Sequence, residues 1–535
     1  MFDLIIQHGE IIDGTGSAAQ RMDIALTQDR IVAMGDLSSA TAHETLDATG
    51  QVVAPGFIDA HAHSDTYLLL EPDAPSKLTQ GITTEINGQC GGSSAPRLGK
   101  ARLPSDWASR VYPQAKGTEK GTQPREAGPT WSTLAEYRER FEQVCPAINT
   151  IQFIGHNTLR AGVMGYEPRH ANNDEIREMQ RRLEQALAEG GWGLSTGLLY
   201  QPGKYATERE VETLARTTAE AGGMYASHIR NEGDTLLESV EAVLRLVETT
   251  GIHAQISHLK TAGPLNWSKI NALLALLNRA REQGLCVHAD RYPYLASGTD
   301  LDIVLPEWAS AGGRDKILAI LRNPSTRETL ETELEASDQD WSRVMIGGGW
   351  TPEVRAVSGL TVTEAATHFG LNIGQTLCHI IDLDDTRTSA FFFGMCEANM
   401  LRIFSEPWIM PGSDASLRAP WGVLGEDHPH PRAYGTMPAF LSLLTSRLGM
   451  SLEEAIRRMT SLPAAAFGIR DRGVLRVGAF ADLVVFRPDA FQAVATYARP
   501  HQFSTGVSHV FINGAHSYQE GHFTGHRRGR FLERQ

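Results

Sequence analysis

Two histidines two residues apart, His61 and His63, lie in the apolar stretch "APGFIDAHAHSD" at residues 54–65. In a β-strand, residues i and i+2 point to the same face, so both imidazoles are expected to project together where the strand leaves its sheet. Neutral imidazoles that converge on one point are ligands of a divalent metal ion. Because such a pair is also common in surface loops, the rest of the chain must decide between these interpretations.

Four further side chains with metal-binding atoms follow other strand-like runs. Cys90 ends "TTEINGQC", His228 lies in "MYASHI", His258 in "HAQISHLK" and Asp414 in "IMPGSDA". Each has a structural alternative, because a free cysteine is often a buried small hydrophobe, a histidine can be a core residue, and an aspartate can cap a helix. Their common position at strand ends favours a metal site. Imidazole and thiolate ligands favour zinc over magnesium or calcium.

The elements that must position these side chains alternate between strand-like and helix-like patterns. Eight strand-like runs are "FIDAHAH", "TTEINGQC", "IQFIGHN", "GLSTGL", "MYASHI", "HAQISHLK", "LCVHADRY" and "IMPGSDA". Amphipathic stretches such as "DEIREMQRRLEQALAEGG" separate them. This order predicts an α/β fold, a TIM-type (β/α)8 barrel, in which the site is built at the C-terminal ends of the strands.

Both ends of the chain depart from the barrel pattern. Residues 1–54 and 470–535 show short alternating strands separated by turn residues, which predicts one small β-sandwich domain formed by the two ends together. Residues 55–469 are then the barrel. Within them, the interval 295–405 between the seventh and eighth strands exceeds an ordinary βα loop, which predicts a lid or insertion over the substrate.

Composition limits the class of protein. The chain has 535 residues, of which 41% are apolar and 21% charged, values typical of a soluble globular enzyme. A net charge of -14 argues against general nucleic-acid binding, which requires clustered Lys and Arg. The start "MFDLIIQHGE" lacks the pattern of a signal peptide or a membrane anchor, and five widely spaced cysteines do not suggest a disulfide framework. We therefore expect a cytoplasmic protein with no membrane partner.

The motifs also carry a family resemblance. "VVAPGFIDAHAH" together with the terminal β-domain resembles the amidohydrolase superfamily. "GITTEINGQCG", "SHIRNEGD", "ISHLK", "DRYPY", "GSDAS" and "HPHPRAYGT" resemble the N-acyl-D-amino-acid deacylase (D-aminoacylase) family within it, over nearly the whole chain. The resemblance implies one tightly bound zinc ion, held by Cys90, His228 and His258. It also implies a second, weaker metal position, lined by His61, His63 and Asp414.

This resemblance implies a reaction as well as a metal. Zinc-dependent hydrolysis of the amide bond of N-acyl-D-amino acids would release a carboxylate and a free D-amino acid. Metal-bound hydroxide is expected to attack the amide carbon, with Asp414 as general base and then general acid. Lys260 and Tyr292 match family positions associated with the substrate α-carboxylate, and Arg230, two residues beyond His228, is expected to face the same way.

Substrate preference follows from one departure from the family pattern. The stretch "LASGTDLDIV" has no arginine of the kind expected to bind a second carboxylate, which favours neutral, apolar D-residues over D-glutamate or D-aspartate. Arg418 and His430, in the loops after the eighth strand, are further candidates. Two alternatives stay open: a relative that acts on another amide, such as a D-residue dipeptide, a cyclic imide or a xenobiotic, and a metal-free scaffold or interaction protein of the same fold.

Overall fold

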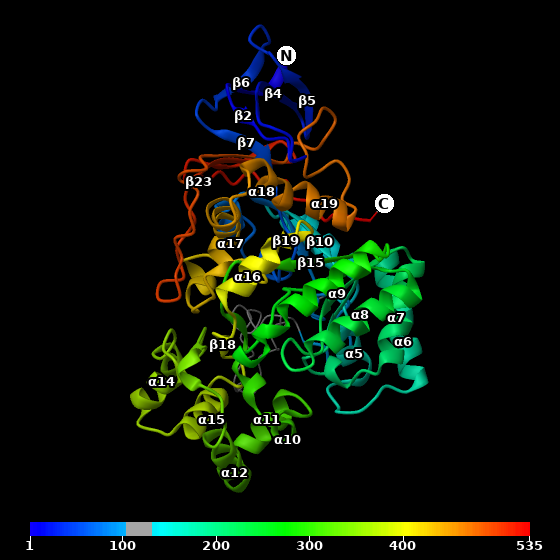
Figure 1. Cartoon of the computed structure of the whole chain (residues 1–535), viewed down its shortest axis with the longest axis vertical. Helices are drawn as coiled ribbons and strands as arrows, with labels where there is room; N and C mark the ends of the chain where they lie inside the picture. The colour runs from blue at the N-terminus through cyan, green and yellow to red at the C-terminus, as the bar shows by residue number, and fades with distance from the viewer. Residues whose placement is uncertain (103–130, 535) are drawn as a thin grey trace, which may run out of the picture.

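Three regions follow one another along the long axis of the molecule (Figure 1). β-Sheets from the two termini lie at one end, the barrel lies in the middle, and a largely helical insertion lies at the other end. The computed structural model describes residues 1–102 and 131–534. Among these residues, no helix combines the length and the hydrophobicity needed to cross a membrane.

Parallel strands form the central barrel, and they are the eight that the sequence predicts. They are β8 (Phe57–Asp59), β9 (Ile82–Asn87), β10 (Asn149–Gln152) with its continuation β11 (Ile154–Gly155), β12 (Gly193–Gly197), β13 (Met224–His228), β14 (His253–Ile256), β15 (Val287–Arg291) and β19 (Ile409–Pro411). The last strand returns to the first, because the Ala60 N–H donates to the Pro411 carbonyl at 3.1 Å and Ala62 bridges to Ala415 in parallel. The predicted fold class is therefore confirmed.

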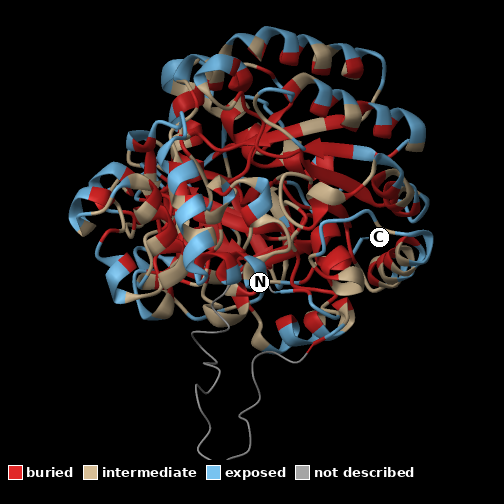
Figure 2. Ribbon diagram, turned by 90° about the horizontal axis from the view of Figure 1, so that it is seen from below, coloured by how far each residue is buried: buried red, intermediate tan, exposed pale blue. Residues whose placement is uncertain are grey.

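Helices cover the outside of the barrel with one buried and one exposed face (Figure 2). They include α5 (His156–Met164), α6 (Asn173–Ala188), α7 (Glu208–Glu220), α8 (Leu236–Thr250), α9 (Ile270–Glu282), α16 (Glu397–Phe404), α17 (Arg432–Ser442) and α18 (Leu452–Met459). In α6, the Asn172 and Glu175 side chains each accept a hydrogen bond from the other's backbone N–H and fix the start of the helix. Its buried residues recur at spacings of three and four: Ile176, Met179, Leu183 and Ala186.

Both chain ends contribute to one β-region. Strands β1 (Phe2–Gln7), β4 (Asp23–Thr27), β5 (Arg30–Gly35) and β6 (Ala42–Asp47) form a four-stranded sheet. A seven-stranded sheet has the order β23-β22-β21-β20-β7-β2-β3, formed by β2 (Glu10–Ile11), β3 (Gln20–Arg21), β7 (Val52–Pro55), β20 (Leu483–Phe486), β21 (Val507–Ile512), β22 (Ala515–Gln519) and β23 (His522–Phe523). Antiparallel pairing of β7 with β20 joins the two ends, and side chains of both pack into a shared core. The exact domain limits stay a prediction.

The long interval before the eighth barrel strand folds into an insertion with its own core. Strands β16 (Ser297–Asp300), β17 (Val344–Ile346) and β18 (Ser389–Phe392) pair antiparallel in the order β16-β18-β17. The helices around them are α10 (Glu307–Ser310), α11 (Arg314–Leu321), α12 (Pro324–Glu335), α13 (Pro352–Arg355), α14 (Val362–Phe369) and α15 (Ile373–Leu383). Because β16 and β18 also line the cavity described below, the insertion helps to form the mouth of the barrel.

Candidate active site

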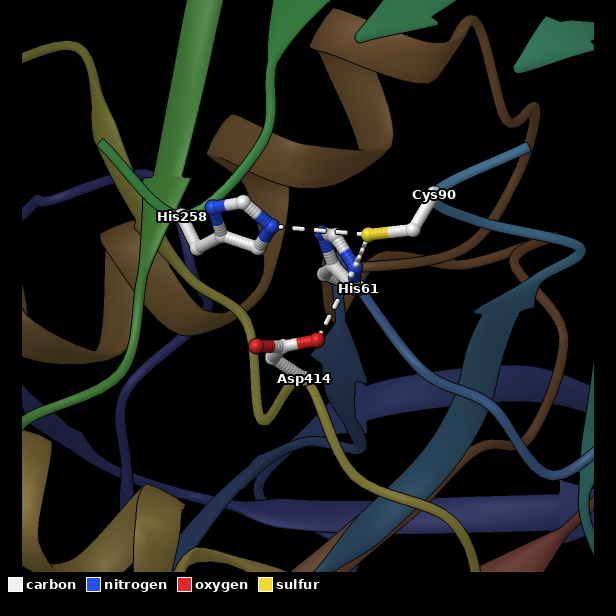
Figure 3. A group of neighbouring side chains, drawn as sticks. All are labelled: His61, Cys90, His258 and Asp414. Atoms are coloured by element: carbon white, nitrogen blue, oxygen red, sulfur yellow. Dashed lines mark hydrogen bonds and ion pairs between the residues drawn. The ribbon is translucent and has the colours of Figure 1, made fainter. Parts of the chain in front are cut away.

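Metal-binding side chains converge at the C-terminal ends of the barrel strands. Figure 3 shows the side chains of His61, Cys90, His258 and Asp414 pointing toward one another. One ligand atom from each lies within 4.8 Å of all the others. The Cys90 Sγ atom is 3.3 Å from His61 Nε2 and 3.4 Å from His258 Nε2. Ligand atoms around a tetrahedral zinc ion stand about 3.5 Å apart, so the spacing and the donor types both fit zinc.

His63 and His228 adjoin this group. The Nε2 atom of His63 is 3.0 Å from Asp414 Oδ1, and the ring centroid of His228 is 4.5 Å from that of His258. Within the described part of the chain, neither ring nitrogen of buried His228 has a hydrogen-bond partner. A buried polar atom without a partner is costly, and a bound metal ion would satisfy it. The structure thus brings all six predicted ligands together, while their division between two metal positions stays a prediction.

The backbone is strained at three of these positions. Cys90, His258 and Asp414 have φ values of 52°, 38° and 48°, in the left-handed region that non-glycine residues rarely adopt. Each lies in the loop that follows a barrel strand, where the turn directs its side chain across the barrel mouth. Strain of this kind is retained where the surrounding structure enforces it, and it concentrates at functional sites.

Carboxylates behind the histidines fix the orientation of two rings. Asp290 Oδ2 lies 3.3 Å from His61 Nδ1, and Glu232 Oε1 lies 2.9 Å from His258 Nδ1. Both arrangements leave Nε2 facing Cys90. At His61 the carboxylate on the outer nitrogen sets the tautomer and strengthens the ring as a metal ligand. At His258 the Lys260 ammonium lies closer still to Nδ1, at 2.7 Å. Sequence reasoning missed both carboxylates: Asp290 could have been found at the end of strand β15, whereas Glu232 lies in a loop whose direction no periodicity fixes.

Charges in the site favour the ionised forms of two ligands. Burial alone would raise the pKa of the Cys90 thiol, but the imidazoles of His61 and His258 hold that pKa well below its ordinary value. Burial would likewise raise the pKa of Asp414, but Arg432 and His258 hold it well below its usual range. At neutral pH the site therefore presents a thiolate and a carboxylate, the forms that bind a cation.

A cavity of about 400 Å³ opens beside these ligands. The predicted residues Lys260 and Tyr292 line it. The Lys260 ammonium pairs with Glu232, and the buried Tyr292 hydroxyl has no hydrogen-bond partner among the residues described. Arg432, which sequence reasoning did not single out in "HPHPRAYGT", is buried here with Nη1 2.7 Å from Asp414 Oδ2 and its guanidinium 4.6 Å from the Tyr292 ring centroid.

The three remaining sequence candidates are Arg230, which lies outside the cavity, and Arg418 and His430, which lie at it. Arg230 is exposed, and its guanidinium donates to the carbonyls of Lys204 and Ala206 at 2.8 and 3.1 Å rather than lining the cavity. Arg418 and His430 do line the cavity. The guanidinium of Arg230 donates to backbone carbonyls, so we do not assign Arg230 to the substrate.

A buried ion cluster ties the strands that carry the ligands. The Lys77 Nζ atom lies 2.6 Å from Glu85 Oε1 and 3.2 Å from Asp59 Oδ2, and all three side chains are fully buried. The Asp59 carboxylate also accepts from the backbone N–H groups of Ser413, at 2.8 Å, and His61, at 3.3 Å. Strands β8 and β9 and the loop that bears Asp414 are therefore held by one lysine.

The Lys77→Met variant is expected to lose about 3–5 kcal/mol of unfolding free energy, because it leaves two buried carboxylates without their cation. Urea denaturation measures this loss. The matched control is Arg216→Met, which removes an exposed ion pair with Glu212 at 2.8 Å and is expected to cost less than about 1 kcal/mol. Equal stability of the two variants would contradict a supporting role for Lys77.

Known proteins resemble the chain over its full length. The amidohydrolase family model matches residues 44–289 and 409–518. An N-acyl-D-glutamate deacylase of Alcaligenes xylosoxydans xylosoxydans is 36% identical over 533 residues, which cover 99% of this chain and 96% of that protein.

Solved structures show the same similarity. A crystal structure of D-aminoacylase matches with a TM-score of 0.82 at 33% identity, and the match covers 100% of both chains. The N-acyl-D-glutamate deacylase from Bordetella bronchiseptica, solved in complex with zinc and a phosphonate that mimics the tetrahedral intermediate of its reaction, matches with a TM-score of 0.81 at 34% identity and the same coverage.

Proposed function

The chain belongs to the amidohydrolase family, and on that premise we propose that it is a zinc-dependent deacylase that hydrolyses the amide bond of N-acyl-D-amino acids. The observation that carries the proposal is the convergence of cysteine, histidine and aspartate at the mouth of the barrel, beside a cavity with buried cationic and hydroxyl groups. The activities named for the similar proteins, and the zinc bound by one of them, support the metal and the substrate class.

Six residues would hold the metal. Cys90, His228 and His258 form the tight zinc position in this proposal, with His61, His63 and Asp414 around a second, weaker one. Bound zinc would supply Lewis acidity, which lowers the pKa of water and polarises the amide carbonyl.

Asp414 moves the proton. Its Oδ1 atom accepts the proton of the attacking water and returns it to the nitrogen of the departing amine, so that the C–N bond breaks as the amino acid leaves. Arg432 lies 2.7 Å from Oδ2, which keeps the carboxylate charged and fixes its orientation. The proton therefore enters and leaves through the other oxygen.

The α-carboxylate of the substrate binds at the side of the cavity formed by Tyr292, Lys260 and Arg432. The Tyr292 hydroxyl and the Nε–H of Arg432 there have no hydrogen-bond partner among the described residues. In the described part of the chain, the cations that line the cavity are Lys260, Arg418 and Arg432, and each already faces a carboxylate. Lys260 and Arg432 are taken by the α-carboxylate, and Arg418 already faces Asp427. No cation of the described lining therefore remains for a second carboxylate, and a neutral D-side chain fits this cavity better.

The Tyr292→Phe variant is expected to raise KM for N-acetyl-D-methionine about tenfold, because a hydrogen bond to a charged carboxylate is lost. Steady-state kinetics measure the change, with kcat altered less than KM because the contact is present in both ground and transition states. Tyr294→Phe is the matched control, since this buried hydroxyl also lacks a partner among the described residues but does not line the cavity. A KM equal to that of the control would remove Tyr292 from substrate binding.

Release of methionine from N-acetyl-D-methionine and N-acetyl-L-methionine tests the function itself. Selective release from the D-isomer is the expected result. Hydrolysis of a cyclic ureide with neither methionine derivative cleaved would support the alternative of a relative that acts on another amide.

A further inference from the structure

A second cavity, of about 440 Å³, adjoins the one beside the metal ligands. We call the two the inner and the outer cavity. The outer cavity lies between the barrel mouth and the insertion, whose residues Ile303 and Ile317 help to line it. The residues that line both cavities stand at their common boundary, which we call the passage. They are Leu199, Tyr200, Asp300, Ser389, Arg418 and Asp427.

The passage lies on the side of the metal-binding residues toward which the acyl group of the substrate extends. Tyr292 and Arg432, which receive the α-carboxylate, are placed next to Asp414, whereas the Tyr200 ring packs on His228 with 4.6 Å between centroids. The substrate carries its carboxylate and its acyl group on opposite sides of the amide. With the carboxylate at Tyr292 and the amide carbon at the ligands, the acyl group extends toward Tyr200.

We propose that the outer cavity is an acyl-group subsite that takes a polar acyl group about the size of an amino-acid residue, so that the best substrates are acylated or peptide-like compounds ending in a D-residue. This inference rests on the proposed function and names its substrate class more closely. The outer cavity alone, at about 440 Å³, is in the size range of a small-molecule site and offers far more room than an acetyl group fills.

The polarity of the passage selects the kind of acyl group. Arg418 Nε lies 3.2 Å from Asp427 Oδ2, and Asp300 and Ser389 add further polar surface. Arg314 and Asp302 line the outer cavity but not the inner one. A hydrocarbon chain placed here would desolvate these groups without replacing their hydrogen bonds, while an amide can donate and accept in their place. The subsite therefore favours an amide-containing acyl group over an alkyl chain of equal length.

The test compares three D-methionine derivatives: N-acetyl, N-pentanoyl and N-acetylglycyl. The last two have acyl chains of equal length and differ in polarity. We expect kcat/KM to be roughly tenfold higher for N-acetylglycyl-D-methionine than for the pentanoyl compound. Ile303 lines the outer cavity and is 37% exposed, so an Ile303→Trp variant would narrow that cavity. This variant is expected to reduce the ratio of kcat/KM for the acetylglycyl compound to kcat/KM for the acetyl compound. The matched control Leu265→Trp, at a leucine 92% exposed outside both cavities, is expected to keep that ratio.

The outcomes separate this inference from the function beneath it. If the acetyl compound is cleaved and kcat/KM for the pentanoyl compound equals or exceeds that for the acetylglycyl compound, the polar subsite is overturned. The proposed deacylase function would still stand. A preference for acetylglycyl that Ile303→Trp does not change also overturns it, because the outer cavity is then not where the acyl group binds. If no D-methionine derivative is cleaved at full zinc loading, the proposed function fails and the subsite with it.

Discussion

Asp414→Asn is expected to lower kcat about a thousandfold while the tightly bound zinc remains in place. Asparagine keeps the shape and one oxygen of the side chain but cannot accept and return a proton, and general acid–base catalysis contributes about 10²–10⁴-fold. The strained backbone at Asp414 tolerates asparagine better than most residues. Amino-acid release measures kcat, and metal analysis of the same sample measures zinc.

Asp174→Asn is the control for this prediction. Its side chain is 86% exposed on the outside of the barrel, where it pairs with Arg177, so the same chemical change leaves the reaction untouched. Full activity in Asp414→Asn would remove Asp414 from the mechanism. Loss of zinc together with activity would make Asp414 a principal ligand rather than the proton carrier.

The Cys90→Ala variant is expected to bind zinc more than about 100-fold more weakly than the wild type and to lose activity as a result. Mutation of a group that only hydrogen-bonds to a ligand costs about 10–100-fold in metal affinity, and removal of the ligand itself should cost more. The neighbouring imidazoles of His61 and His258, acting against burial, keep the pKa of Cys90 low, so the wild-type protein offers a thiolate at neutral pH. Competition with a chelator measures the affinity. Added zinc at high concentration is expected to restore part of the activity if the histidines still converge.

Cys286→Ala is the matched control for the thiol. Burial raises the pKa of Cys286, the opposite of the shift at Cys90, and Cys286 lines neither the inner nor the outer cavity. This variant is expected to bind zinc as the wild type does. If Cys90→Ala also kept its zinc and its turnover, Cys90 would be the buried small hydrophobe that the sequence allows.

The barrel could be predicted from strand and helix periodicity, and the convergence of six side chains from their common position at or just beyond the C-terminal ends of the strands. Within a strand the two-residue repeat decides which face a side chain occupies, and parallel strands bring their C-terminal ends to one edge. Strand β8 ends at Asp59, so His61 and His63 lie just beyond the region where this repeat holds, and their position at a strand end is what predicted the site. The family and the fold class predicted from the motifs are confirmed by the comparisons.

Side chains in loops could not be predicted in the same way. Arg230 lies two residues beyond His228, yet the chain has already left strand β13 there, and backbone carbonyls rather than the two-residue repeat decide its direction. Arg432 and Glu232 reach the site from loops and a helix start whose course depends on tertiary packing. The left-handed backbone at Cys90 likewise leaves no trace in composition or spacing.

The central claim, that a zinc site in this chain hydrolyses N-acyl-D-amino acids, is tested most directly by titrating metal-depleted protein with zinc. At each step, methionine release is measured from N-acetyl-D-methionine and from N-acetyl-L-methionine. We predict that release from the D-isomer rises with zinc, saturates near one ion per chain, and stays far above release from the L-isomer. No release from the D-isomer at any zinc loading, or equal rates for the two isomers, would contradict the claim.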